Sequence, residues 1–179
     1  EAHFNLGNSC ALLGRYAEAI EAFKQALRIK PNDAEAHFNL GNSCALLGRY
    51  AEAIEAFKQA IRIKSNDAEA HFNLGNCCAL LGRHVEAIES HKQAIRINPD
   101  YAEAHFNLGN SCALLGRHAE AIESYMQAIR IDPDYADAHY NLGISYFITG
   151  ERGSALEQYK ILKDLDREQA SELFNLIYK

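Results

Sequence analysis

The sequence predicts an all-α protein made of tandem antiparallel helix pairs. A unit of 34 residues, AEAHFNLGNSCALLGRYAEAIEAFKQAIRIKSND at residues 34–67, recurs along the chain. Within each copy, apolar residues recur with the 3.6-residue period of a helix. No stretch alternates apolar and polar residues as a half-buried strand does. Because one helix pair cannot bury its own apolar surface, neighbouring copies are expected to stack into a solenoid.

The repeat defines the domain organisation, and we expect a single repeat domain over residues 1–179. The copies occupy residues 1–33, 34–67, 68–101, 102–135 and 136–169. A terminal helix is expected at about residues 167–178. The fifth copy diverges most, as a terminal unit with one neighbour does. Because the chain opens inside a repeat and without Met, we expect a piece of a longer protein.

Each copy divides into two helical segments around a Leu-Gly-Arg sequence. In the second copy, we expect Gly48 to end the first helix, and Asn66 and Asp67 to cap the next copy. Proline follows the second segment, where helices end, at Pro31, Pro99 and Pro133. The predicted buried stripes contain Ala36, Leu40, Cys44 and Leu47 in the first helix, and Ala53, Ile54, Phe57, Ala60 and Ile61 in the second.

A glycine and an alanine recur at fixed positions in all five copies, as Gly41 and Ala53 do in the second. Glycine inside a helix costs about 1 kcal/mol relative to alanine. A cost that is repeated in every copy indicates a packing reason. We therefore expect the helix backbones to approach closely at these positions.

These residues form a pattern that resembles the tetratricopeptide repeat family, W-x2-L-G-x2-Y followed by A-x3-F, A and P. In the second copy the pattern reads His37, Leu40, Gly41, Cys44, Ala53, Phe57 and Ala60. Histidine replaces the Trp in every copy, and cysteine replaces the Tyr in all but the last, which has Tyr146. The resemblance implies a right-handed superhelix whose first helices line a concave groove, and it implies peptide binding.

Composition excludes several classes of function. The net charge is −6 and no basic stripe is present, which argues against nucleic acid as a partner. No run of 18 apolar residues occurs, so we expect no membrane span. Five cysteines suit a reducing compartment, and we expect a cytoplasmic protein.

Metal binding and catalysis are also disfavoured, so we expect no cofactor, no metal and no enzyme activity. Equivalent histidines or cysteines lie one repeat apart, roughly 10 Å. Zinc ligands bind at about 2.1 Å and disulfides need Cα atoms within about 7 Å, so we interpret both residue types as packing residues. No nucleophile elbow or P-loop occurs. We expect Glu52 and Glu55 to pair with Lys58 and Arg62 on a solvated helix face.

The other face of each first helix is the candidate site. In the second copy it contains Glu35, Phe38, Asn39, Asn42, Ala45 and Leu46. Asparagine is a poor residue for a helix interior, yet two occur here in four copies. A carboxamide both donates and accepts hydrogen bonds, so a row of them can hold an extended peptide backbone. The alternative is that the face recurs only because the whole repeat recurs.

The predicted groove residues are aromatic or carry amides, and acidic residues line the expected groove edge. The groove set is Phe4, Asn5, Asn8, Phe38, Asn39, Asn42, Phe72, Asn73, Asn76, Phe106, Asn107, Asn110, Tyr140 and Asn141. The edge set is Glu35, Glu69, Glu103 and Asp137. These charges favour a neutral or basic protein segment as the partner.

The asparagine row is similar to that of the O-linked N-acetylglucosamine transferase family, whose repeats hold substrate backbones through such residues. Family members that bind acidic chaperone tails use Lys and Arg on this face, whereas this sequence has Glu35, Phe38 and Asn39. Capture of an acidic tail is therefore disfavoured. The resemblance implies a protein-interaction scaffold that binds an extended segment.

Three alternatives remain open. The chain can be a substrate-recruiting module of a larger enzyme such as a glycosyltransferase, which an adjoining catalytic domain in the full reading frame would support. It can be a scaffold that self-associates end to end through its first copy, which lacks a polar capping helix. It can also be a consensus-style engineered protein, although the drift in copies three to five argues against this.

Overall fold

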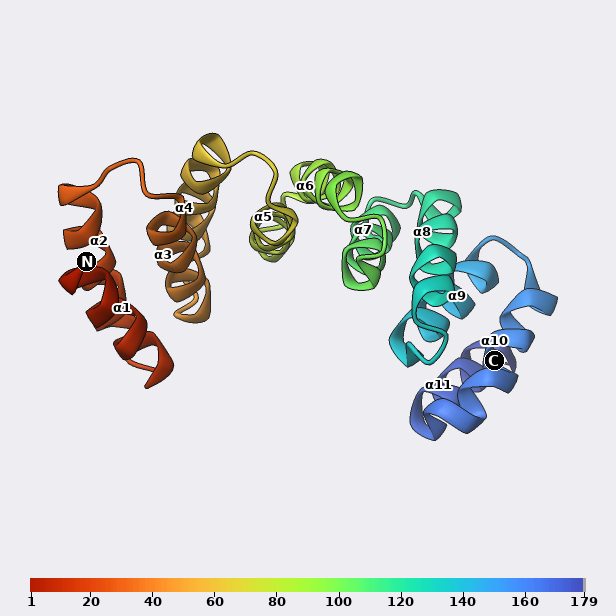
Figure 1. The fold of residues 1–179 in the computed structure, drawn as a ribbon. Helices are drawn as coiled ribbons and strands as arrows, with labels where there is room; N and C mark the ends of the chain where they lie inside the picture. Colours follow the sequence, from red (N-terminus) through yellow and green to blue (C-terminus); the bar gives the residue numbers. More distant parts are fainter. Residues whose placement is uncertain (179) are drawn as a thin grey trace. The chain divides into compact units, whose positions relative to one another are not determined.

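The computed structural model describes residues 1–178, which form eleven α-helices (Figure 1). No strand occurs among these residues, and the predicted all-α class is confirmed. None of the described helices is long and apolar enough to cross a bilayer. The helices are α1 (Ala2–Leu12), α2 (Tyr16–Ile29), α3 (Ala34–Leu46), α4 (Tyr50–Ile63), α5 (Ala68–Leu80), α6 (His84–Ile97), α7 (Ala102–Leu114), α8 (His118–Ile131), α9 (Ala136–Ile148), α10 (Arg152–Leu165) and α11 (Arg167–Tyr178).

Consecutive helices form antiparallel pairs joined by tight turns (Figure 1). The turn between α3 and α4 contains Gly48 at φ 77°, in the left-handed region that glycine adopts without steric cost. The Arg49 N–H donates to the Cys44 carbonyl at 2.8 Å, and the Gly48 N–H donates to that of Ala45 at 2.9 Å. These bonds satisfy the last carbonyls of α3, so the glycine ends the helix as predicted.

The amino ends of the first helices are capped differently along the chain. Asp33 and Asp67 accept hydrogen bonds from the backbone N–H of Ala36 and Ala70, each at 3.1 Å. Capping by Asp67 agrees with the sequence prediction. Tyr135 precedes α9 without a side-chain capping bond, so this helix forms without that stabilisation.

The chain contains two compact units, residues 1–97 and 98–178, which we describe separately. In residues 1–97, α2 packs against α3 and α4 packs against α5, so α3 and α5 are each covered by the preceding second helix. Leu47 was expected in the buried stripe but is exposed, because it follows the last residue of α3 and leaves the helical face. The core includes Ile20, Cys44, Ala53, Ile54, Phe57, Leu74, Cys77, Cys78 and Ala87.

Close approach between paired helices explains the repeated glycine. A Cβ atom on Gly41 would lie 2.7 Å from the ring of Phe57, far inside van der Waals contact. The same relation joins Gly75 to His91 at 2.5 Å and Gly109 to Tyr125 at 2.6 Å. The expected close packing is therefore observed, and its partner is the aromatic side chain of the second helix.

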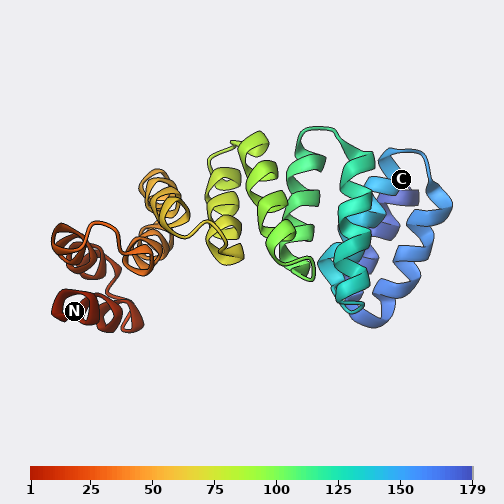
Figure 2. The ribbon, with the colours of Figure 1, turned by 45° about the horizontal axis from the view of Figure 1, so that its top comes forward.

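In residues 98–178, α11 packs on α9 and α10 and covers the last helix pair (Figure 2). Leu173 lies where a Cβ on Gly143 would be, at 2.5 Å. Ile144, which replaces the asparagine of the other copies, packs against the buried apolar cluster that contains Leu173 and Ile177 of α11. The loss of that asparagine in the fifth copy thus follows from the apolar surface of the terminal helix.

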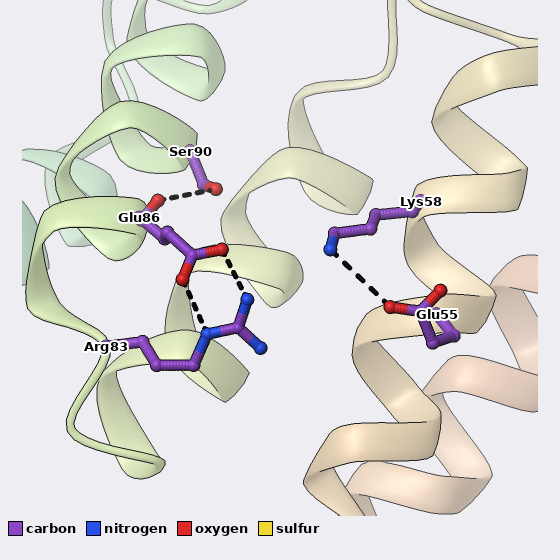
Figure 3. Close-up of polar contacts among 5 residues, drawn as sticks. All are labelled: Glu55, Lys58, Arg83, Glu86 and Ser90. Carbon is purple, nitrogen blue, oxygen red and sulfur yellow. Dashed lines mark hydrogen bonds and ion pairs between the residues drawn. The ribbon is translucent and has the colours of Figure 1, made fainter.

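The second helices present ion pairs to solvent, as Figure 3 shows for α4 and α6. Glu55 pairs with Lys58 at 3.5 Å, and Arg83 binds Glu86, whose backbone carbonyl accepts from Ser90. Glu52 was expected to pair within this face but instead contacts Arg49, three residues earlier, at 2.5 Å. Such exposed pairs contribute little to the stability of the fold, because water screens the charges.

We predict that Gly41→Ala destabilises the fold by about 1–3 kcal/mol, although alanine is the better helix former, because its methyl group overlaps the Phe57 ring. Denaturant unfolding followed by circular dichroism measures the change. The control is Gly153→Ala in α10, where no atom lies within 4 Å of the added methyl group. Equal stability of the two variants would contradict the role of the contact.

Candidate functional site

The predicted amides lie on the first helices and, in residues 1–97, border a hollow between α1 and α3. Asn8, Asn39 and Asn42 line this hollow together with Leu12 and Leu46, and its volume is about 460 Å³. Ala11, Tyr16, Phe23 and Ser43 complete the lining. The structure therefore brings three of the predicted amides together with apolar side chains around one opening.

The same opening recurs between α7 and α9 in residues 98–178. Every lining residue of this hollow, about 440 Å³, lies 102 residues after its counterpart in the first, which is three repeats. Its chemistry differs at four positions. His118 replaces Tyr16, Tyr125 replaces Phe23, Ile144 replaces Asn42, and Ile148 replaces Leu46.

The amides form hydrogen-bonded pairs between successive first helices. The Asn39 Nδ2 donates to Asn8 Oδ1 at 3.0 Å, and the Asn73 Nδ2 donates to Asn42 Oδ1 at 3.1 Å. In the second unit, the Asn141 Nδ2 donates to Asn110 Oδ1 at 2.9 Å. Each pair joins residues 31 apart, so the row of amides also joins neighbouring repeats. The sequence did not reveal this structural role.

The pairing leaves hydrogen-bonding capacity on some amides. A primary amide has two N–H donors and two acceptor lone pairs. The bond between Asn8 and Asn39 uses one donor of Asn39 and one lone pair of Asn8, both on half-buried side chains. The remaining groups of this pair are fixed in orientation, which suits them to bind a second set of polar groups.

Other amides are more fully engaged by the second helices. The oxygen of Asn110 accepts from Asn141 and from the Tyr125 hydroxyl at 2.8 Å. The oxygen of Asn76 lies 3.1 Å from His91 Nε2. Because these oxygens serve buried polar rings, they offer less to a ligand than Asn8 and Asn39 do. The predicted site residues are therefore not equivalent.

The predicted aromatic residues are half-buried against rings of the second helices. Phe4 packs on Phe23 with ring centroids 5.9 Å apart, and Phe38 packs on Phe57 at 5.8 Å. Phe72 lies against the ring of His91, with ring centroids 5.9 Å apart. Each ring thus has a fixed orientation and still contributes apolar area at the surface.

In the last copy, two predicted site residues contact the terminal helix. The Tyr140 hydroxyl donates to Glu172 at 2.9 Å, and Gln169 Nε2 donates to Asp137 at 2.5 Å. The remaining edge residues, Glu35, Glu69 and Glu103, are exposed. These three residues lie in the first turns of α3, α5 and α7, and α11 contacts their fifth-copy counterpart Asp137.

Exposed leucines lie next to the amides, and although the sequence placed Leu46 on the candidate face, the predicted groove set contains no leucine. Leu46 is 64% exposed and lines the hollow, and Leu12 is more exposed still. Leu80 and Leu114 are exposed at the same position of their repeats. The sequence did contain a signal for this exposure, the Leu-Leu pair before each turn glycine. Two consecutive helical residues cannot both face one core, so one leucine of each pair had to face solvent.

The histidines that replace Trp bind the loop before their own helix. His37 Nε2 lies 2.9 Å from the Pro31 carbonyl, and His105 and His139 repeat this contact with Pro99 and Pro133 at 3.0 Å each. A tautomer with its proton on Nε2 donates this bond. The packing role expected for these residues is observed, with a specific polar partner.

Buried titratable groups are shifted toward their neutral forms. Burial lowers the pKa of His91 to about 4, and it raises the pKa of the Cys77 thiol to about 11. All five cysteines are buried free thiols, as expected for core residues. In residues 1–178, no group of three His, Cys, Asp or Glu side chains lies in a metal-binding arrangement.

Comparison with known sequence families identifies the repeat. A tetratricopeptide repeat model matches residues 1–66 and again 34–100, together more than half of the chain. Two further models of this repeat match residues 79–124 and 109–150. The chain belongs to the tetratricopeptide repeat family. Proteins of this family are protein-interaction scaffolds, and that general role applies here.

Solved structures of tetratricopeptide repeat proteins share the fold over almost the full chain. A crystal structure of MamA is 30% identical and covers 93% of this chain and 97% of its own, with a TM-score of 0.88. YrrB, described as a TPR protein with an unusual peptide-binding site, is 26% identical to this chain. The match covers 97% of this chain and 90% of YrrB, with a TM-score of 0.87.

MamA from Desulfovibrio magneticus RS-1 is 23% identical, so this match supports only the shared fold. It covers 94% of this chain and 95% of that MamA chain, with a TM-score of 0.87. The comparison with curated proteins finds no significant match.

We predict that stability falls by up to about 3 kcal/mol between pH 6.5 and pH 4 because of His91. In the unfolded chain this histidine takes up a proton near its ordinary pKa of 6.5, whereas in the folded chain it does so only near 4. Its contribution is therefore complete above pH 6.5 and is lost as the pH falls. Denaturant unfolding at a series of pH values measures it.

His91→Tyr is the matched variant, because Tyr125 occupies the same position one repeat later and binds Asn110. This variant keeps a polar partner for the amide of Asn76 and removes the titrating ring. We expect a shallower loss of stability with acid. An unchanged slope would show that other groups cause the pH dependence.

Proposed function

We propose that the chain binds an extended protein segment along the exposed face of its first helices, with α1, α3 and α5 as the main surface. The hollow between α1 and α3 supports this most directly, because oriented amides and exposed leucines border the same opening. The family role of protein interaction and the peptide-binding site described for YrrB agree with it.

The amides would bind the backbone of the segment. Successive repeats place equivalent amides roughly 10 Å apart. Three residues of an extended chain span about 10 Å, so backbone groups recur in step with the repeat. Asn8, Asn39 and Asn73 retain unpaired amide groups in a fixed orientation, which lowers the entropy lost on binding.

The leucines and the acidic edge would set the preference for side chains. Leu12 and Leu46 offer apolar surface that a small or medium apolar side chain would remove from water. Glu35 and Glu69 are exposed in the first turns of α3 and α5, and they repel acidic segments. We therefore propose a partner segment that is neutral or basic and has apolar residues at a spacing of about three.

We predict that Leu46→Glu weakens binding of a peptide selected from a random linear library by about tenfold or more, because it places a charge in the apolar hollow. Fluorescence anisotropy measures the affinity. Leucine is a better first target than asparagine, since each asparagine also joins two repeats.

Leu47→Glu is the matched control, because this neighbouring leucine is exposed but does not line the hollow. It should keep the wild-type affinity, and both variants should keep the wild-type melting temperature. Equal affinity of the two variants would refute binding at this face.

Self-association through the first repeat is a second candidate. Leu6 in α1 is 53% exposed, whereas its counterpart Leu74, covered by the preceding second helix, is 8% exposed. A hollow of about 600 Å³ lies there, lined by His3, Leu6, Cys10 and Arg15 among others. An uncovered apolar surface of this kind suits contact with another molecule.

We predict concentration-dependent light scattering of the purified chain, and a monomer at all concentrations for Leu6→Glu, because the charge opposes burial of this surface. A wild-type chain that stays monomeric throughout a dilution series would exclude the second candidate.

A binding role rather than a catalytic one is our proposal for the chain itself. A module that recruits substrates to an enzyme such as a glycosyltransferase would use the same face. An adjoining catalytic domain in the full reading frame would support that assignment.

A further inference from the structure

A third and larger hollow lies at the amino end of α3 in residues 1–97. Its volume is about 740 Å³, and the candidate site residues Phe38 and Glu35 line it. The loop before α3 and the residues Ala60, Lys64, Asp67 and Ala70 form its other sides. Its apolar surface comes from one phenylalanine and small side chains, and its rim carries charges of both signs.

In residues 98–178, an aromatic side chain of the chain itself occupies the equivalent place. Phe106 lies 68 residues after Phe38, and Tyr135 lies 68 residues after Asp67. The Tyr135 ring packs on Phe106 with a centroid distance of 4.9 Å and an interplanar angle of 38°. Tyr135 is half-buried there, and this burial raises its pKa to about 12.

The two phenylalanines have the same support on their other side. Phe38 packs on Phe57 and Phe106 packs on Tyr125, each at 5.8 Å. The difference lies in the residue before the next first helix. Asp67 accepts from the Ala70 N–H at 3.1 Å and pairs with Lys64 at 3.0 Å, so its carboxylate is held at the helix end rather than over the ring.

We propose that the hollow at Phe38 binds an aromatic side chain, preferentially tyrosine, from the extended segment. The proposal rests on the proposed function and adds a specificity position to it. The contact of Tyr135 with Phe106 provides the geometry, an inclined ring against the exposed side of the phenylalanine. Ala60 and Ala70 leave space beside the ring of the ligand.

The charged rim favours a neutral aromatic side chain with a polar end. Lys30 and Lys64 line the hollow together with Asp33, Glu35 and Asp67, so neither a cation nor an anion finds a field of one sign. A tyrosine hydroxyl both donates and accepts and can reach groups of either charge. The rim differs here from the surroundings of Tyr135, where the nearby charged groups Glu103, Asp132 and Asp137 are all acidic.

The test uses the full chain, labelled with nitrogen-15, and three capped tripeptides, Ac-Gly-Tyr-Gly-NH2, Ac-Gly-Leu-Gly-NH2 and Ac-Gly-Arg-Gly-NH2. We expect the tyrosine peptide to shift the amide resonances of Glu35, Phe38 and Ala70. Its affinity should exceed that of the leucine and arginine peptides by about fivefold. Equal affinity of the three peptides, or no shift at these residues, would overturn the proposal.

Three variants locate the binding. Asp67→Tyr should place an internal ring on Phe38, as Tyr135 does on Phe106, and abolish the shifts. Asp67→Ala removes the same capping bond and ion pair without filling the hollow, so the resonance shifts caused by the tyrosine peptide should remain. Tyr135→Ala should open the equivalent hollow and add shifts at Glu103 and Phe106. Shifts that persist unchanged in Asp67→Tyr would overturn the proposal.

These outcomes are separate from those of the proposed function. A failure of Leu46→Glu to weaken peptide binding would refute the face between α1 and α3 without affecting the tripeptide result. Conversely, library peptides that depend on Leu46 but whose affinity is the same for wild type and Asp67→Tyr would overturn only the aromatic position.

Discussion

The close approach of a second-helix ring to a first-helix glycine is the constraint on which the repeat depends. Phe23, Phe57, His91 and Tyr125 each occupy the space that a Cβ atom would need. The glycine costs about 1 kcal/mol of helix stability, whereas burying a large apolar side chain gains about 1.5–3 kcal/mol. The contact is therefore favourable, and it fixes the distance between the helices of a pair.

That fixed distance also determines what the amides do. Where the ring is polar, the second asparagine of the same repeat becomes its partner, as Asn76 is for His91 and Asn110 is for Tyr125. Buried polar groups need such partners. Replacement of the second-helix phenylalanine by histidine or tyrosine is thus tolerated, because an amide of the same repeat forms a hydrogen bond with the polar ring. The same replacement reduces the amide capacity left for a ligand, which is why our proposal relies on Asn8, Asn39 and Asn73 rather than on Asn76 and Asn110.

The two units use one architecture with different surface chemistry. The hollow between α1 and α3 has Tyr16 and Asn42 where that between α7 and α9 has His118 and Ile144. At the amino ends of the first helices, Asp67 leaves Phe38 beside an open hollow, whereas Tyr135 covers Phe106. Substitutions at few positions therefore change which side chains a segment would meet along the face.

The sequence by itself determined the helix pairs, their turns and the face on which each residue lies. These properties follow from a 34-residue period, the helical period and the preferences of glycine and aspartate, all of which act locally. Family membership and the close packing at Gly41 were predictable for the same reason. Leu47 was assigned wrongly because the stripe was extended one residue past the helix end.

Only the tertiary structure decided how the side chains are paired. Asn39 has Asn42 one helical turn away, yet it donates to Asn8 in the preceding repeat. That choice depends on the register in which the first helices stack, which no local pattern encodes. The partners of His37 and Glu52, and the ring that covers Phe106, likewise result from contacts between elements. Repetition of the sequence places equivalent residues on the same helix face in every copy. Contacts with the neighbouring helices then determine which polar groups remain available for a ligand.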